Sequence, residues 1–243
     1  MPTAVDTQHM TAEFDFSGRV AVITGACGAL GSAVVDEFAE AGATVAACDI
    51  VDVESEDSLL EPGERTQFYQ ADFTDEDAVA ETIDRIVDNH GRIDYLLNIA
   101  GTWRGGDPVE ETDASQFDML FDVNLKTMFL ASKHALPHLQ ETEGAIVSVS
   151  ARSGLEGGEG DGLYRSTKAS VKIMTETIAA ENLGTVRANC VMPSVLDTPM
   201  NREMMTPKDE WVQPDQVARV MQFCCSDAAE VTSGAAVPVY GEA

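Results

Sequence analysis

Hydrophobic positions along the 243-residue chain alternate between short continuous runs and longer stretches with helical spacing. The apolar run Arg19–Thr24 lies between turn residues, which predicts a buried strand. From Glu76 to Asn89, apolar residues recur at the spacing of one helical face, which predicts an amphipathic helix. The two patterns follow one another from end to end. This order predicts an α/β fold, a Rossmann-type doubly wound parallel sheet of about seven strands with helices on both faces.

The same patterns place the other elements. Further strands are predicted at Thr44–Asp49, Gln67–Gln70, Tyr95–Asn98, Ala145–Ser150, Arg187–Met192 and Ala236–Val239. Further helices are predicted at Leu30–Ala41, Ala114–Leu139, Tyr164–Leu183 and Asp215–Cys225. Residues 193–212 lack periodicity and contain three prolines, which predicts a loop or short-helix lid. We expect an acidic N-terminal tail at 1–17 and a single domain at 18–243.

The charge of the chain limits its partners. Asp and Glu number 42 against 15 Lys and Arg, a formal net charge of −27. Nucleic acids and anionic lipids would be repelled, so we expect neither a nucleic acid nor a membrane as a partner. The expected partner is a small-molecule substrate. Self-repulsion of this strength is tolerable where concentrated salt shortens the Debye length, which predicts a high-salt cytoplasm. No apolar run approaches the ~20 residues of a membrane helix, and residues 1–17 lack a secretory pattern, so we expect a cytoplasmic protein.

Cysteine and histidine give no metal or disulfide pattern. The five cysteines lack paired Cys-x-x-Cys spacing, and the four histidines are scattered. Cys48 and Cys190 lie in apolar runs, where cysteine behaves as a small hydrophobic residue. We therefore expect neither a metal site nor a disulfide framework.

A glycine-rich loop separates the first predicted strand from the first predicted helix. Its residues include Gly25, Gly28, Ala29, Leu30 and Gly31. At this position in a doubly wound sheet, a helix N-terminus presents free N–H groups that a pyrophosphate can approach closely. The strand before the loop, the helix after it and an acid ending the next strand together predict a dinucleotide site.

Asp49 is that acid, and it bears on the choice of cofactor. Its carboxylate can accept a hydrogen bond from a ribose 2′-hydroxyl and would repel a 2′-phosphate. No basic residue occurs between residues 25 and 64, so NAD(H) is expected over NADP(H). Asp72, followed by Phe73, is placed to meet the adenine amino group. The alternative is that Asp72 only belongs to the cap of the next helix.

Tyr164 and Lys168 are the candidate proton-handling pair. Four residues apart on a predicted helix, they lie on one face and can approach the same ligand. A nearby ammonium stabilises a phenolate, so we expect the Tyr164 pKa to fall from about 10 toward the working pH. The alternative is a surface helix with an aromatic anchor and a solvated lysine.

With these motifs assembled, the chain resembles the short-chain dehydrogenase/reductase family over nearly its whole length. The matching elements are Thr24-Gly25-x-x-x-Ala29-x-Gly31, Asp72, Asn98-Ile99-Ala100-Gly101, Asn124, Tyr164-x-x-x-Lys168 and Pro193 through Thr198. The resemblance implies an NAD(P)-dependent enzyme in which Tyr164 exchanges the substrate proton and Lys168 tunes Tyr164 and holds the nicotinamide ribose. It also implies that Asn124 organises a water-linked proton path.

Other implied roles concern the cofactor and the assembly. The Pro193–Thr198 loop would hold the carboxamide, and we expect cofactor contacts from Asn98, Ala100, Gly101, Pro193, Val195 and Thr198. The two long predicted helices resemble those that pair in family dimers and tetramers. The resemblance therefore implies a homodimer or homotetramer.

The chain departs from the family at its catalytic serine, where Ala151 stands. Ser150 and Ser153 are the nearest hydroxyls, but a one-residue step along a strand reverses the side chain, so Ser150 substitutes only if the strand end bulges. One branch, the dihydropteridine reductases, lacks that serine, and the chain resembles it locally. The resembling stretches are Gly28–Ser32, Ala100–Gly106 and Leu196–Arg202, with Trp103 and Trp211 as candidate substrate contacts.

Three functions follow from these features. The favoured hypothesis is an NADH-dependent reductase of a flat conjugated substrate such as a quinonoid dihydropterin, which needs little polarisation of one oxygen. The second is a carbonyl or alcohol oxidoreductase, such as a 3-oxoacyl reductase, with Ser150 or Ser153 in the missing role. The third is a weakly catalytic NAD-binding sensor or structural protein.

Overall fold

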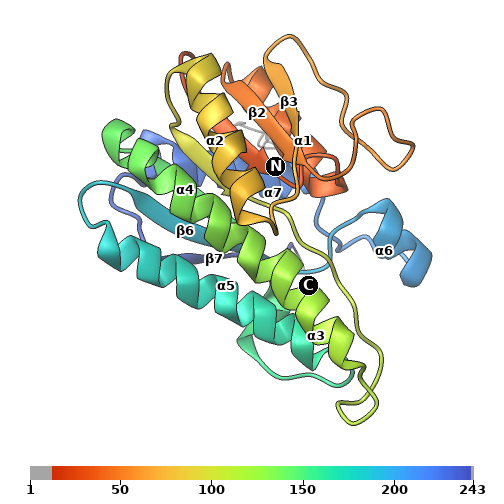
Figure 1. Ribbon diagram of the computed structural model, residues 1–243. Helices are drawn as coiled ribbons and strands as arrows, with labels where there is room; N and C mark the ends of the chain where they lie inside the picture. Colours follow the sequence, from red (N-terminus) through yellow and green to blue (C-terminus); the bar gives the residue numbers. More distant parts are fainter. Residues whose placement is uncertain (1–12, 242–243) are drawn as a thin grey trace, which may run out of the picture.

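The computed structural model describes residues 13–241 and contains one seven-stranded parallel sheet (Figure 1). The strand order is β3-β2-β1-β4-β5-β6-β7. The strands are β1 (Val20–Thr24), β2 (Thr44–Asp49), β3 (Thr66–Gln70), β4 (Tyr95–Asn98), β5 (Ala145–Val149), β6 (Arg187–Pro193) and β7 (Ala236–Val239). The predicted fold class is confirmed. It could be predicted because strands buried on both faces of a parallel sheet form continuous apolar runs in the sequence.

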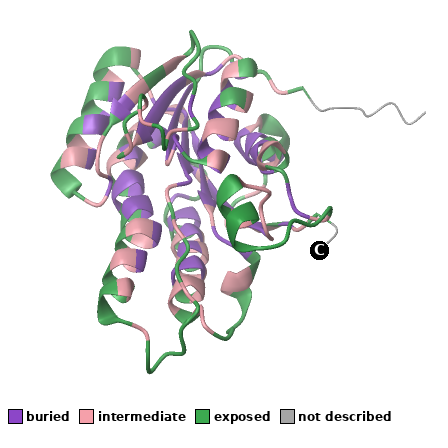
Figure 2. Cartoon of the chain, turned by 90° about the vertical axis from the view of Figure 1, so that its right-hand side faces the viewer, coloured by how far each residue is buried: buried purple, intermediate pink, exposed green. Residues whose placement is uncertain are grey.

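Helices cover both faces of the sheet. One face packs against α1 (Ala29–Glu40) and α7 (Pro214–Cys225), and the other against α2 (Glu76–His90), α4 (Thr127–Thr142) and α5 (Gly162–Glu181). Figure 2 shows buried residues along the strands and exposed residues along the outer sides of the helices. The shorter helices are α3 (Ala114–Phe121), α6 (Pro199–Met204), η1 (Asp122–Lys126), η2 (Arg152–Leu155) and η3 (Asp227–Ala229).

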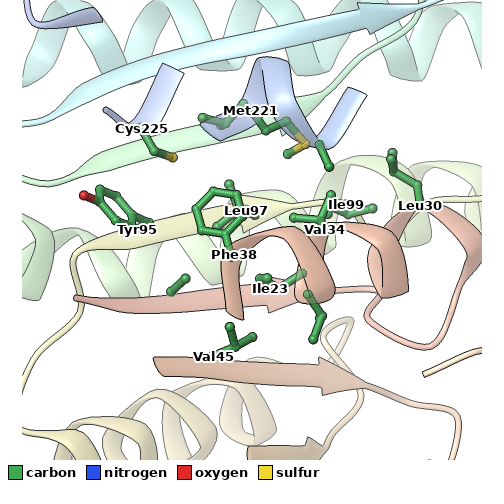
Figure 3. Packing of buried hydrophobic residues seen from close by; sticks show 14 of the residues in the cluster. Ile23, Leu30, Val34, Phe38, Val45, Tyr95, Leu97, Ile99, Met221 and Cys225 are labelled. Atoms are coloured by element: carbon green, nitrogen blue, oxygen red, sulfur yellow. The ribbon is translucent and has the colours of Figure 1, made fainter. Parts of the chain in front are cut away.

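The core between the sheet and α1 and α7 extends to the residues before β1. Figure 3 shows Phe38 of α1 packed above Leu97 and Ile23 of the sheet, close to Met221 of α7. Phe16 is buried in the same cluster and stacks on Phe38 with ring centroids 5.1 Å apart. The packed structure therefore begins before Gly18, within the segment predicted as a tail. Residues 1–12 of that predicted tail lie outside the described residues.

The predicted helix Ala114–Leu139 is not continuous. A π-helical turn, η1, interrupts it between α3 and α4. The inserted turn shifts the register of the backbone, and Asn124 lies within it, buried. Single π turns inside longer helices occur often at functional sites, because they redirect one side chain.

The topology fixes where a ligand can bind. The strand order reverses between β1, which pairs with β2 on one side, and β4 on the other. In doubly wound sheets the crevice at such a point, outside the carboxyl ends of the strands, receives the ligand. The loops at residues 25–28, 99–113, 150–161 and 194–213 leave the carboxyl ends of β1, β4, β5 and β6 and surround this crevice. Among residues 13–241, no helix has the length and apolarity to cross a membrane.

Candidate active site

The glycine loop after β1 has a shape that larger residues would destroy. Gly25 has φ +68°, and a Cβ there would lie 2.8 Å from the Ala100 backbone. A Cβ on Gly31 would lie 1.9 Å from the Gly25 carbonyl oxygen. Gly28 is the N-cap of α1 and brings no side chain to cap the helix. The first N–H groups of α1 therefore remain available to an anionic ligand, as the phosphates of a dinucleotide require.

Asp49 and Asp72 line a cavity beside this loop. Asp49 accepts hydrogen bonds from the backbone N–H of Cys27 at 2.8 Å and of Val51 at 3.0 Å, so it also braces the glycine loop. One Asp72 oxygen accepts from the N–H and hydroxyl of Thr74 at 2.8 and 2.7 Å. The cavity of about 110 Å³ is also lined by Ile50, Ala71, Phe73, Ala100 and Val123. Acceptors and apolar walls of this kind fit the adenosine half of a dinucleotide.

Asn98 lies inside the sheet, away from the surface of this cavity. It is buried, and its amide nitrogen donates to the hydroxyls of Ser132 and Ser148, each at 3.2 Å. The side chain thus crosslinks β4, α4 and β5, and the predicted contact of Asn98 with the cofactor stays a prediction. The hydroxyl of Thr24 accepts from the N–H groups of Ile99 and Ala100, which sets the chain direction after β4.

Asn124 holds the loop after β4 against α5. Its Oδ1 accepts from the Thr102 N–H at 2.6 Å, and its Nδ2 donates to the Thr102 carbonyl at 2.9 Å and to the Thr167 hydroxyl at 3.1 Å. A Cβ on Gly101 would lie 3.1 Å from Asn124 Oδ1 and 3.2 Å from Lys168 Nζ. The π turn thus delivers Asn124 to the Tyr164 helix. Its part in a proton path stays a prediction.

Tyr164 and Lys168 lie together in the first turns of α5, as predicted, but burial sets their pKa values. The Lys168 ammonium lies 5.9 Å from the centre of the Tyr164 ring and donates to the Val149 carbonyl at 3.0 Å. Burial, followed by the charge of Asp161, raises the Tyr164 pKa to about 12, and burial lowers the Lys168 pKa to about 8. The predicted lowering of the Tyr164 pKa is wrong in this structure because desolvation disfavours the phenolate.

Ser150 does not take the place of the missing serine. Its N–H donates to the Val191 carbonyl at 2.9 Å, so the pairing with β6 continues past β5 without a bulge. Its buried hydroxyl donates to the Lys168 carbonyl at 2.7 Å. The condition for its substitution is therefore not met. Ala151 follows it, and Ser153, partly exposed, stands in η2.

The predicted lid, residues 193–212, contains the short helix α6 and is held at several points. The Thr198 hydroxyl caps α6, and Asp197 forms two hydrogen bonds with the Arg202 guanidinium at 2.5 and 2.7 Å. Val195 accepts from the Val212 N–H at 3.0 Å. Pro193 ends β6 as a buried residue.

The two tryptophans predicted as substrate contacts differ in exposure. Trp211, near the end of the predicted lid, is 7% exposed and so is buried in the fold. Trp103, on the loop after β4, is 42% exposed and is the one with a ring free to meet a ligand.

The cysteine thiols are all buried or partly shielded. Burial raises the pKa of every cysteine thiol, so these groups stay protonated and unreactive. Within residues 13–241, no three His, Cys, Asp or Glu side chains gather as metal ligands.

Two neighbours of Tyr164 were missed by the sequence analysis. Arg165 and Asp161 form an ion pair at 2.5 Å in the first turn of α5. Their spacing of four residues was a signal that could have found them, since such pairs meet on a helix. Thr102 and Thr167, which bind Asn124, have no comparable signal in the sequence.

The fold and the site define the class of the protein. A doubly wound sheet, a glycine loop at an uncapped helix N-terminus and a Tyr–Lys pair at the same edge are the parts of a dinucleotide-dependent oxidoreductase. Residues 19–209 match the profile described as short chain dehydrogenase, and the chain belongs to this family. Its members are oxidoreductases that bind nicotinamide cofactors.

Relatives and solved structures agree with this assignment. The chain is 33% identical over 240 residues to 3-oxoacyl-[acyl-carrier-protein] reductase of Thermotoga maritima, covering 92% of this chain and 97% of the relative. It is 34% identical to meso-2,3-butanediol dehydrogenase of Serratia marcescens, covering 94% and 95%. A 3-ketoacyl-(acyl-carrier-protein) reductase from Brucella melitensis complexed with NADH superposes with TM-score 0.86 at 26% identity, covering 93% and 98%. These relatives are named as reductases and dehydrogenases that act on carbonyl or alcohol groups. None of these matches is a dihydropteridine reductase, so the predicted resemblance to that branch is not shown.

Proposed function

We propose that the chain is an NAD(H)-dependent oxidoreductase that interconverts a carbonyl group and an alcohol on a small-molecule substrate. The observation that carries this proposal is the Tyr164–Lys168 pair at the carboxyl edge of the sheet, on the same edge as the glycine loop. The reactions named for the Thermotoga and Serratia relatives support this substrate class. The test is loss of NADH absorbance in concentrated salt with a panel of ketones and 3-oxoacyl thioesters. NADH binding without consumption of any substrate would overturn the proposal.

Tyr164 would donate a proton to the substrate oxygen during reduction and take it back during oxidation. A bound nicotinamide supplies or accepts the hydride. Because the Tyr164 pKa is about 12, the phenol is protonated at neutral pH, as a proton donor must be. Lys168 would bind the nicotinamide ribose and compensate the charge that the phenol acquires when it gives up its proton.

The preference for NAD(H) rests on Asp49. Its carboxylate would accept a hydrogen bond from the ribose 2′-hydroxyl and repel the 2′-phosphate of NADP(H). Asp49→Asn keeps one acceptor for the Cys27 N–H but removes the charge. We expect the ratio of kcat/KM for NADH over NADPH to fall about 10-fold to 100-fold, since hydrogen bonds to charged groups are worth about 1.5–3 kcal/mol.

Steady-state kinetics with both cofactors measures this ratio. Asp57→Asn is the matched control, because Asp57 is an exposed acid of the loop after β2. A ratio that Asp49→Asn leaves at the wild-type value would contradict the assignment of Asp49.

A second candidate function, reduction of a flat conjugated substrate such as a quinonoid dihydropterin, is favoured by Ala151. The family position that supplies a hydroxyl to the substrate oxygen carries a methyl group here. A conjugated substrate needs less polarisation of one oxygen than a ketone does. The exposed ring of Trp103 could stack on such a substrate.

Ala151→Ser separates the two candidates. If the substrate is a ketone, the new hydroxyl should raise kcat about 10-fold to 100-fold in a Ser153→Ala background, where Ser153 cannot supply the missing donor, because one donor to a developing oxyanion is worth about 10²–10³ in rate. Turnover of a quinonoid dihydropterin should not change. Ala151→Gly, which adds no hydroxyl, is the control for altered packing. If Ala151→Ser raised kcat equally on both substrates, the new hydroxyl would not distinguish a ketone from a conjugated substrate.

We also propose a homodimer or homotetramer in a high-salt cytoplasm. Exposed apolar side chains on α3, α4 and α5, namely Phe117, Phe129 and Ile173, support self-association. The net charge of −27 supports the salt-rich environment.

A further inference from the structure

Arg165 connects the Tyr164 helix to the loop that precedes it. Its Nε donates to the Asp161 carboxylate at 2.5 Å, and one terminal nitrogen donates to the carbonyls of Ser153 at 3.4 Å and Glu156 at 3.2 Å. The side chain is only 23% exposed, so these contacts are partly shielded from solvent. A single planar guanidinium therefore binds both ends of residues 153–161, which an ammonium could not span in the same way.

The 153–161 loop closes tightly over this guanidinium. A Cβ on Gly158 would lie 2.3 Å from the central carbon of Arg165. The Gly160 carbonyl accepts from the Gly106 N–H at 2.6 Å, which ties the loop to the one that carries Trp103. The two loops run side by side below α3 and α5 in Figure 1. Arg165 is thus the internal support of one wall of the candidate substrate site.

The η2 turn at the start of the loop is also docked on α5. A Cβ on Gly154 would lie 2.9 Å from the backbone of Lys168, so the turn contacts the helix directly. Ser153 directly precedes Gly154, and the Ser153 carbonyl accepts the hydrogen bond from Arg165. With Ala151 lacking a hydroxyl and Ser150 bound to Lys168, Ser153 carries the next hydroxyl along the chain.

We propose that Arg165 is a positioning residue that holds Ser153 in the η2 turn beside α5, and that the Ser153 hydroxyl donates to the substrate oxygen. Ser153 then supplies the donor that is absent at residue 151. This inference rests on the proposed carbonyl chemistry and extends it to residues outside the family motif. Asp161 contributes separately: its charge raises the Tyr164 pKa, and the ion pair with Arg165 offsets that charge.

A double-mutant cycle tests the coupling of the two side chains in the full-length protein with saturating NADH. Ser153→Ala in the wild type should lower kcat for a ketone about 10²-fold, the usual cost of one donor to a developing oxyanion. Arg165→Met should lower kcat at least about 10-fold, while the Kd for NADH stays within about twofold. In the Arg165→Met background, Ser153→Ala should cost no more than about 10-fold, so that the double variant is about as slow as Ser153→Ala alone, because coupled residues are not additive. Fully additive losses, or an unchanged kcat in Arg165→Met, would overturn the inference.

Two further variants guard against a trivial loss of structure. Arg165→Lys can still pair with Asp161 but cannot bridge both carbonyls, so we expect an intermediate loss of about threefold to tenfold in kcat with normal folding. Arg219→Met is the matched control, because Arg219 makes the same four-residue ion pair, with Asp215 at 2.7 Å, in the first turns of α7. A loss in Arg219→Met equal to that in Arg165→Met would assign the effect to general destabilisation.

Amide hydrogen exchange separates this inference from the proposed function. Arg165→Met should speed exchange across residues 153–161 at least about fivefold, because local opening follows the loss of the bonds that hold a loop, and Arg219→Met should not. A wild-type protein that reduces no carbonyl substrate would defeat the proposed function, and exchange alone would then decide the positioning role. Unchanged exchange in Arg165→Met overturns that role.

Discussion

Tyr164→Phe should lower kcat for carbonyl reduction about 10²-fold to 10⁴-fold, the range that a positioned general acid contributes. Phenylalanine keeps the ring in place on α5 and removes only the hydroxyl that donates the proton. On the proposed binding of NADH by the glycine loop and the Asp49 cavity, its Kd should change far less than kcat. Single-turnover kinetics and fluorescence titration with NADH measure the two quantities independently.

Tyr95→Phe is the matched control for this substitution. Tyr95 begins β4 at the amino ends of the strands and packs in the core beside Phe16 with ring centroids 5.1 Å apart. Its hydroxyl is distant from the carboxyl edge, so kcat should stay within about twofold, as for substitutions away from a reacting centre. Carbonyl reduction that survives Tyr164→Phe at the wild-type rate would remove this phenol from the mechanism.

Much of the fold could be predicted because buried parallel strands leave a clear pattern in the sequence. The predicted strands Thr44–Asp49, Tyr95–Asn98 and Ala236–Val239 have the observed bounds. The π turn at Asn124 could not be predicted, because one extra residue in a turn barely alters the spacing of apolar residues. Its position depends on tertiary hydrogen bonds from Asn124 to Thr102 and Thr167.

The candidate site was predictable as a set of motifs and less so as a set of contacts. Tyr164, Lys168, Asp49 and Asp72 lie where their spacing placed them. The hydrogen bonds from the Asn98 side chain to Ser132 and Ser148 could not be predicted, because these serines are distant in the sequence.

The direction of the Tyr164 pKa shift was predicted wrongly, since the pKa is raised and not lowered. A sequence states which charges are near in the chain, but it does not state how deeply a phenol is buried, and burial is the largest cause of the shift.

Gly31→Ala should disable the cofactor site and destabilise the fold together. The added methyl carbon would lie 1.9 Å from the Gly25 carbonyl oxygen and 2.8 Å from the Ala26 Cα, both backbone atoms that cannot rotate away. Relief requires α1 to move away from the glycine loop, which displaces the N–H groups expected to bind phosphate. We expect the Kd for NADH to rise at least about 10-fold and the free energy of unfolding to fall by about 1–3 kcal/mol, as in other overpacked sites.

Calorimetry and NADH titration check the two effects, with Gly63→Ala as the matched control. Gly63 has open space where a Cβ would lie, so the same chemical change there should leave the Tm and the Kd at their wild-type values. A fall of about 1 kcal/mol corresponds to a Tm shift of roughly 2–4 °C in a chain of this size. The backbone cannot keep its geometry with the added methyl group present. If Gly31→Ala nevertheless bound NADH as tightly as the wild type, the close approach of α1 to the Gly25 carbonyl would have no role in holding the cofactor.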